Sequence, residues 1–141
     1  MQTKYSSLVN LKKKITQKSE SVLKTANSNL NSAMKVLETS CSELNGIITP
    51  KSGKISEFLS IRTLLDSQRA IIKHNEEWVK FAQEETNHAK EQLKLDMIEF
   101  EKFNYLELQE IKEMLKKIHM KETKELDEIA LMTYDKKIDK R

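Results

Sequence analysis

The stretch GIITPKSG, residues 46–53, decides the fold of this chain, because it holds both glycines and the only proline among 141 residues. Glycine costs roughly 1 kcal/mol and proline roughly 3 kcal/mol inside a helix, so a cluster of them marks a break in a helical chain. The segments on either side, 1–45 and 54–141, contain neither residue. The sequence therefore predicts one domain over residues 1–141, a helical hairpin with a first helix at about 3–45, a turn at 46–53 and a second helix at about 54–138.

The composition favours an elongated helical protein over a globular one. Charged residues make up 33% of the chain and hydrophobic residues 38%, which suits a pair of long helices that share a narrow apolar seam. The net charge of +3 comes from 25 basic and 22 acidic residues, a mixed surface that gives no reason to expect nucleic acid as a partner. The single Cys41 cannot form an internal disulfide, and no apolar stretch approaches the ~20 residues needed to span a bilayer. We expect a cytoplasmic protein with no transmembrane helix and no secretory signal.

Both arms carry residues at the three- and four-residue spacings of a coiled coil. In the first arm the expected seam contains Leu8, Leu11, Ile15, Val22, Ala26, Leu30, Ala33, Leu37, Cys41 and Leu44. In the second arm it contains Ile61, Leu64, Gln68, Ile71, Asn75, Trp78, Ala82, Thr86, Ala89, Leu93, Met97 and Phe100. These patterns predict an all-α fold, a long two-helix antiparallel coiled-coil hairpin in which Trp78 fills the seam.

The second arm is about twice as long as the first, so the second helix should overhang the first. If the hairpin closes at 46–53, Leu44 pairs near Ile55 and the N-terminus pairs near positions 95–100, which leaves about forty residues without an intramolecular partner. An apolar stripe continues into this unpaired end and contains Phe103, Leu108, Ile111, Leu115, Ile118, Leu126 and Ile129. Contiguous exposed apolar patches usually mark interaction sites. The unpaired end should therefore bind either a second copy of the chain or a different protein.

Catalysis and metal binding receive no support from the pattern. The histidines His74, His88 and His119 are too scattered along a helix to share a metal ion, and a pair of helices offers no cleft of the size that enzymes use. We therefore expect no catalytic residue, no metal and no cofactor. The basic run Lys12 to Lys14 could contact anionic lipid or nucleic acid, but three lysines on a helix usually form a solvated face.

The segment KETKELDEIALMTYDKK, residues 121–137, resembles the C-terminal signature of the FliJ family of flagellar export proteins. The similarity rests on Leu126-Asp127-Glu128-Ile129-Ala130, followed by Tyr134, Lys136 and Lys137. A second similarity is Ala70-Ile71-x-x-His74, which looks like an Ala-Ile-x-x-His stretch early in the second helix of the family. The resemblance implies a long two-helix antiparallel coiled coil in the cytoplasm that carries out no chemistry of its own.

The resemblance also implies a role in the flagellar type III export apparatus, at the cytoplasmic face of the flagellar base. The implied partners are the hexameric export ATPase, the cytoplasmic domain of the export gate protein FlhA, and export chaperones, and the protein would be peripheral to the membrane only through them. By this resemblance the candidates for ATPase contact are Leu126, Asp127, Glu128, Ile129 and Tyr134. The candidates for export-gate contact are Ala70 and His74.

Each of these residues also has an ordinary structural explanation, as part of the helical stripe, as a solvated charge or as a small seam residue. Many members of the family carry tyrosines near the end of the first arm, on the face used for the gate, whereas residues 37–48 here contain none. Phe58, Trp78 or Phe81 could supply the gate contact instead, because aromatic residues are enriched at binding hot spots. The alternative function is a generic coiled-coil scaffold or export chaperone that self-associates through the overhanging helix.

Overall fold

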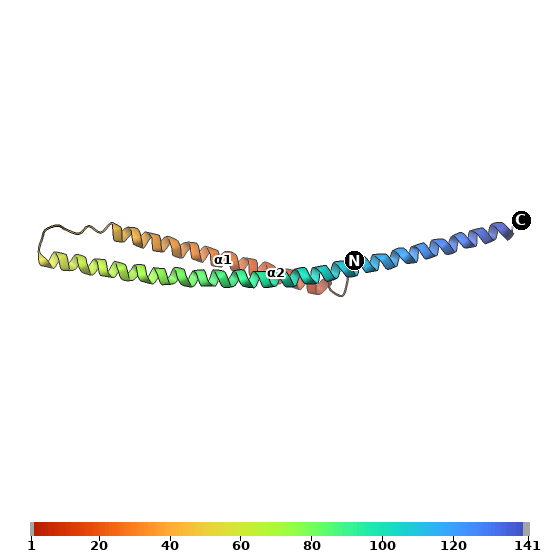
Figure 1. Cartoon of the computed structure of the whole chain (residues 1–141), viewed down its shortest axis with the longest axis horizontal. Helices are drawn as coiled ribbons and strands as arrows, with labels where there is room; N and C mark the ends of the chain where they lie inside the picture. Colours follow the sequence, from red (N-terminus) through yellow and green to blue (C-terminus); the bar gives the residue numbers. More distant parts are fainter. Residues whose placement is uncertain (1, 140–141) are drawn as a thin grey trace. The chain divides into compact units, whose positions relative to one another are not determined.

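The computed structural model describes residues 2–139 and consists of two helices joined by a loop (Figure 1). Helix α1 spans Ser6–Asn45 and helix α2 spans Ile55–Asp139, with 40 and 85 residues respectively. The described residues contain no strand, and side chains are described up to residue 137. The expected all-α hairpin is confirmed.

The break between the helices lies where glycine and proline cluster. At the end of α1 the backbone N–H of Gly46 donates to the carbonyl of Ser42 at 3.0 Å. Before α2 begins, Gly53 adopts a φ of 155°, a conformation that residues with a side chain rarely take. The side chain of Glu57, from the first turn of α2, occupies the space that a Cβ atom on Gly53 would need. The backbone conformation is therefore the reason for glycine at position 53, because the flexible Glu57 side chain could move away from a Cβ atom.

Contacts divide the chain into two units, and each unit contains a part of both helices. The first unit joins the residues up to Lys14 with those from Met97 onward, and the second unit comprises Ile15–Asp96. In each unit α1 runs antiparallel beside α2 (Figure 1). In the first unit Ser6 Oγ donates to Glu107 Oε1 at 3.0 Å, whereas in the second Thr16 Oγ1 donates to the carbonyl of Asp96 at 3.3 Å.

The core of the second unit is a narrow seam of small side chains. Ala33 and Thr86 are completely buried, and Leu30, Ala33 and Ala82 form a cluster against which Val79 packs. The buried residues of this seam are Thr16, Ala26, Leu30, Ala33 and Ser40 on α1, and Gln68, Asn75, Ala82, Thr86 and Ala89 on α2. The buried residues lie three, four, seven or ten positions apart, all of them sums of three- and four-residue steps, so the seam follows the heptad spacing of a coiled coil. Small side chains let the helix backbones approach closely but bury little apolar area.

A polar network lies inside this seam near the loop. Ser40, which is 4% exposed, accepts a hydrogen bond at its Oγ from Asn75 Nδ2 at 3.1 Å. The carbonyl of Ser40 accepts a second one from Gln68 Nε2 at 2.9 Å, and the same amide nitrogen lies 3.2 Å from Glu43 Oε2. Ser40 Oγ also donates to the carbonyl of Leu37 at 2.8 Å. A buried polar layer of this kind favours one register over others, because slipping the helices would leave the amides without partners.

The expected seam is wrong at several positions. Six residues assigned to it are exposed: Leu11, Val22, Leu64, Ile71, Trp78 and Met97. On α2 the half-buried positions are instead Leu65, Ile72 and Val79, each one residue further along the chain. Trp78, at 39% exposed, therefore lies at the edge of the seam and does not fill it.

The expected pairing of the helices is also wrong. The bonds of Ser40 to Gln68 and Asn75 place the last turns of α1 beside residues 68–75 of α2, and not beside Ile55. The loop is the physical reason. Extended residues advance about 3.3 Å each against 1.5 Å in a helix, so the loop reaches well beyond the end of α1, where Pro50 lies against Ser56 and other residues of the first turns of α2.

Two segments of α2 consequently have no partner from α1. Residues 51–60, which include the first turns of α2, are all exposed. At the other end every residue from 115 to 137 is exposed, so the overhang, defined here as residues 115–139 of α2, begins later than the expected positions 95–100. The shifted pairing thus shortens the overhang at the C-terminal end and uncovers α2 at its beginning.

Candidate partner-binding surfaces

An apolar stripe on α2 leads into the overhang. The stripe consists of Leu108, Ile111, Leu115 and Ile118, three of which are between 44% and 57% exposed. Leu108 and Leu115 each lie one residue after a half-buried position, Glu107 and Met114, whereas Ile111 is itself half-buried. One residue corresponds to a rotation of about 100° around a helix. Leu108 and Leu115 therefore face a different direction from the half-buried positions in this unit of the chain.

The terminal part of the overhang has a different pattern. Five large apolar side chains lie within nine residues and are each between 59% and 66% exposed: Leu126, Ile129, Leu131, Met132 and Tyr134. At about 100° per residue they point in directions spread over most of the helix circumference. A helix that is apolar on many sides is normally one that is surrounded. This segment therefore differs from the one-sided stripe before it.

The structure places the candidate ATPase-binding residues in this terminal segment. Leu126, Asp127, Glu128, Ile129 and Tyr134 are all exposed. Within the described part of the chain, the carboxylates of Asp127 and Glu128 form no ion pair. The sequence interpretation missed Leu131 and Met132, each 63% exposed. The signal that could have revealed them is the absence of a single apolar face in the sequence from 126 to 134.

The candidate gate-binding residues lie in the other unit. Ala70 and His74 are exposed on α2, one turn apart, on the side that faces away from the seam residues Gln68 and Asn75. Neither side chain belongs to an apolar cluster, so this position alone offers little area for a protein partner. No ion pair within the described residues involves His74.

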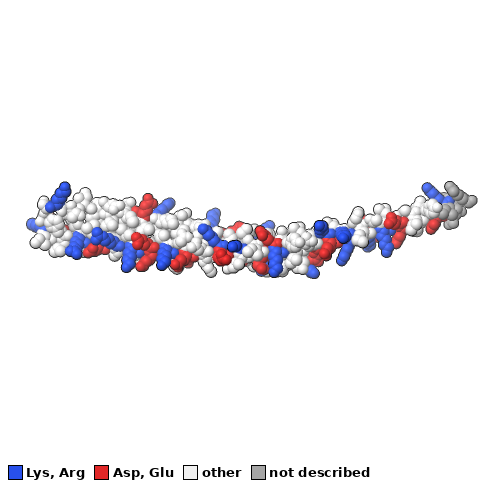
Figure 2. Space-filling model, viewed as in Figure 1, with Lys and Arg blue, Asp and Glu red and all other residues white. Residues whose placement is uncertain are grey.

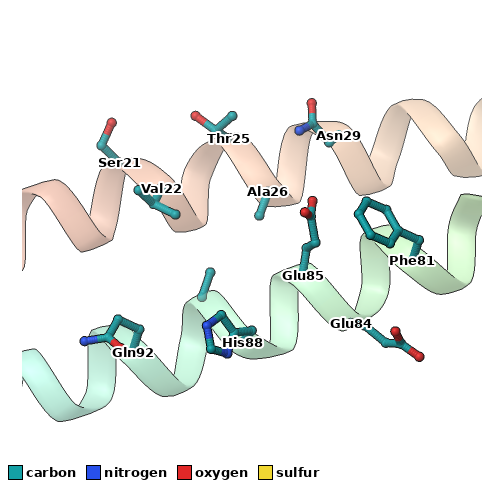
Figure 3. A pocket seen from close by; sticks show the side chains of 11 residues that line it. Ser21, Val22, Thr25, Ala26, Asn29, Phe81, Glu84, Glu85, His88 and Gln92 are labelled. Atoms are coloured by element: carbon teal, nitrogen blue, oxygen red, sulfur yellow. The ribbon is translucent and has the colours of Figure 1, made fainter.

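A groove beside the seam offers more apolar surface than Ala70 and His74 do. It has a cavity volume of about 690 Å³ and runs between α1 and α2. Figure 3 shows Val22 and Ala26 on α1 and Phe81 and Glu85 on α2 directed into the space between the helices, whereas Glu84 points away. Phe81 is 58% exposed. The groove exists because small residues fill this part of the seam and leave its edge open.

The basic run near the N-terminus is partly engaged in packing. Lys12 Nζ lies 3.9 Å from Glu99 Oε2 and 5.8 Å from the centre of the Phe103 ring. Lys13 and Lys14 are exposed. On the face shown in Figure 2, basic and acidic side chains are interspersed along the molecule. This run therefore does not form an extended basic surface.

The described part of the chain contains neither a cluster of metal ligands nor a membrane-spanning helix. Among the side chains that the structure describes, no three of His, Cys, Asp or Glu lie close enough together to hold a metal ion. Neither helix, in its described part, has a stretch long and apolar enough to span a membrane.

Comparison with known proteins identifies the family. The model of the family described as "Flagellar FliJ protein" matches residues 1–138, nearly the whole chain. No curated protein and no solved structure matches at a significant level. The match covers both helices, including the first arm, for which the sequence had shown only length and periodicity. The chain therefore belongs to the FliJ family and is a flagellar export-related protein.

Proposed function

We propose that this protein is a stalk-like component of the flagellar type III export apparatus, and that its overhang inserts into the hexameric export ATPase at the cytoplasmic face of the flagellar base. The observation that carries the proposal is the terminal segment 126–134, where exposed apolar side chains point in several directions around one helix. A ring can cover all sides of a helix that enters it, whereas a flat docking surface covers only one. The protein supplies contacts and not chemistry, so the ATPase alone carries out hydrolysis.

The aliphatic residues of this segment would supply most of the binding energy. Leu126 and Leu131 are 66% and 63% exposed and lie about 140° apart around the helix. Burying a leucine side chain fully contributes about 1.5–3 kcal/mol, so losing one of them from a buried interface weakens binding by about tenfold or more. Asp127 and Glu128 would contribute mainly to orientation and to the rate of association, because charges at an interface act chiefly in that way.

The test uses two substitutions on different sides of the helix. The purified protein is titrated into the export ATPase, and ATP turnover and ring assembly are followed for the full chain, a chain truncated after Lys121, and the variants Leu126→Ser and Leu131→Ser. Met120→Ser is the matched control, because Met120 is 62% exposed but lies outside the segment. Truncation should abolish stimulation, and each leucine variant should weaken it by about tenfold.

The two leucine variants separate insertion from one-sided docking. If Leu126→Ser weakens binding and Leu131→Ser leaves it unchanged, the overhang contacts the ATPase through one face and the insertion proposal is wrong. If the truncated chain stimulates ATP turnover as well as the full chain, the overhang is not the contact at all.

We also propose that the cytoplasmic domain of FlhA docks at the groove, with Phe81 and Trp78 as its main anchors. The supporting observation is that Phe81, which is 58% exposed, lines an apolar groove, and that Trp78, three residues earlier on α2, is 39% exposed. Phe81→Ala should weaken gate binding by at least about tenfold, while Ala70→Ser and His74→Ala should change it by less than about threefold. If Phe81→Ala leaves gate binding unchanged and Ala70→Ser or His74→Ala weakens it, the gate contact lies at Ala70 and His74 and not at the groove.

Export chaperones are further proposed partners, linked by this protein to the ATPase and the gate. The alternative is a scaffold or chaperone that self-associates through the overhang, and it would use the apolar stripe from Leu108 to Ile118 that leads into the overhang. Sedimentation of the pure protein distinguishes the two. A monomer that binds the ATPase supports the stalk, and a stable dimer without ATPase affinity supports the scaffold.

A further inference from the structure

The end of the hairpin that carries the loop exposes apolar side chains without a partner. We call residues 46–60 the hairpin tip. Within it Ile48 is 85% exposed and Ile55 is 79% exposed, the two highest values for large hydrophobic side chains in the described part of the chain. Leu59 is also 58% exposed. These residues are uncovered because the loop carries the chain beyond the end of α1, so the first turns of α2 have no neighbouring helix.

The charges of the hairpin tip are of one sign over most of its length. Residues 46–56 contain Lys51 and Lys54 and no aspartate or glutamate. The one acidic residue of the tip, Glu57, lies against Gly53. Lys51 and Lys54 are both exposed, and neither forms an ion pair within the described residues. On the face shown in Figure 2, the loop end of the molecule is largely uncharged, with basic side chains beside it. The tip therefore combines protruding isoleucines with adjacent lysines.

We propose that the hairpin tip docks on a lipid bilayer that contains anionic headgroups, with Ile48 and Ile55 entering the interface and Lys51 and Lys54 contacting the phosphates. Membrane-surface segments combine apolar residues that insert with basic residues that contact anionic lipids. The inference goes beyond the proposed function and requires neither the ATPase nor the gate. It would give the protein a direct membrane contact in addition to any contact through partners.

The shape of the hairpin tip favours a lipid surface over a protein partner. A protein hot spot normally pairs with a concave, well-packed pocket, and the groove beside Phe81 has that character. At the tip the cavity lined by Pro50, Ser56 and Ser60 is smaller, about 430 Å³. The most exposed isoleucine, Ile48, does not line it. Isoleucines that protrude from the end of a hairpin suit a soft, deformable surface.

The test is co-sedimentation of the full chain with vesicles. The vesicles consist of phosphatidylcholine alone or with 30% phosphatidylglycerol, at 0.1 M and 0.5 M salt. Binding should require the anionic lipid and weaken at high salt. The variant Lys51→Gln/Lys54→Gln should lower the partition coefficient by about 25-fold, since each lysine near an anionic surface contributes about fivefold. The variant Ile48→Ser/Ile55→Ser should lower it by about a hundredfold.

Matched controls distinguish an effect of the hairpin tip from the effect of losing positive charge or exposed apolar area anywhere on the protein. Lys13→Gln/Lys14→Gln removes the same charge from another exposed basic site. Leu64→Ser/Ile71→Ser removes exposed apolar side chains from the flank of α2, where they are 52% and 48% exposed. Both controls should bind vesicles within about twofold of the unaltered chain. Circular dichroism confirms that each variant remains helical.

A second measurement reports insertion directly. In a Cys41→Ser background, Ile48→Cys carries an environment-sensitive dye whose emission should shift to the blue with anionic vesicles, whereas the same dye on Glu77→Cys should not respond. Three results would overturn the proposal: no binding at about 1 mM anionic lipid, equal loss of binding in the lysine control, or no dye response at position 48. Tip variants that keep vesicle binding but lose the gate protein would assign the tip to a protein partner.

Discussion

Replacing Ser40 by alanine should destabilise the hairpin, although alanine is the better helix former. Ser40 is 4% exposed and its hydroxyl accepts the hydrogen bond from Asn75 Nδ2 at 3.1 Å. Asn75 is itself only 6% exposed, so its amide has little access to water. Removing the hydroxyl leaves the buried amide of Asn75 without an acceptor. The free-energy cost of this unsatisfied donor is larger than the gain in helix propensity, so the substitution should be destabilising.

The magnitude follows from two opposing terms. A buried donor left without its acceptor costs about 1–3 kcal/mol, and we take about 2 kcal/mol for the amide of Asn75. Alanine returns about 0.5 kcal/mol through its higher helix propensity. The free energy of unfolding should therefore fall by about 1.5 kcal/mol. Ser42→Ala is the matched control, because Ser42 is exposed on the same helix and should gain stability by about 0.5 kcal/mol.

The assay is urea denaturation followed by circular dichroism and by the fluorescence of Trp78, which lies in the same unit as Ser40. A double-mutant cycle with Asn75→Ala isolates the contact and should give a coupling free energy of about 2 kcal/mol, because the unsatisfied amide is absent when Asn75 is removed as well. If Ser40→Ala stabilises the hairpin as much as Ser42→Ala does, the hydrogen bond contributes nothing and the reasoning is refuted.

Four other substitutions test the register, the loop and the first unit. Leu65→Ala should cost about 2 kcal/mol in urea denaturation and Leu64→Ala less than about 0.5 kcal/mol, because only the first is half-buried; equal costs would contradict the observed register. Gly53→Ala should lower the free energy of unfolding by about 1 kcal/mol, measured by thermal denaturation, because its φ is 155°; an unchanged midpoint would argue against strain. Phe103→Ala removes the ring beside Lys12 and should speed amide hydrogen exchange in the first turns of α1 by about tenfold, an effect that should be absent from residues 26–33.

The break between the helices could be predicted from the sequence because the cost of glycine and proline in a helix is local. The register could not, because residues such as Leu64 and Leu65 are adjacent and both apolar. Either leucine fits a spacing of three or four residues. Side-chain size does not indicate which one faces α1, because the seam is built from Ala33, Thr86 and other small residues. Which residue faces α1 depends on pairing across the hairpin, and that information is not local.

Of the candidate binding surfaces, the sequence could predict the terminal segment but not the hairpin tip. The terminal segment could be singled out by its resemblance to a family, and the surplus of apolar residues there needed no knowledge of the fold. The hairpin tip could not be found in this way, because Ile48 and Ile55 belong to a segment assigned to the turn and its edge. Their exposure depends on the extended path of the loop, which carries the chain past the end of α1 and leaves the start of α2 uncovered.

The rotation of the apolar stripe from the seam has a consequence for the order of assembly. Since Leu108 and Leu115 face about 100° away from Glu107 and Met114, a helix bound to Leu108 and Leu115 would lie alongside α1 instead of competing with it for the same positions. Binding there needs no opening of the hairpin and so does not incur its unfolding free energy. The hairpin can therefore be folded before a partner helix binds there, and it can stay folded when that helix leaves.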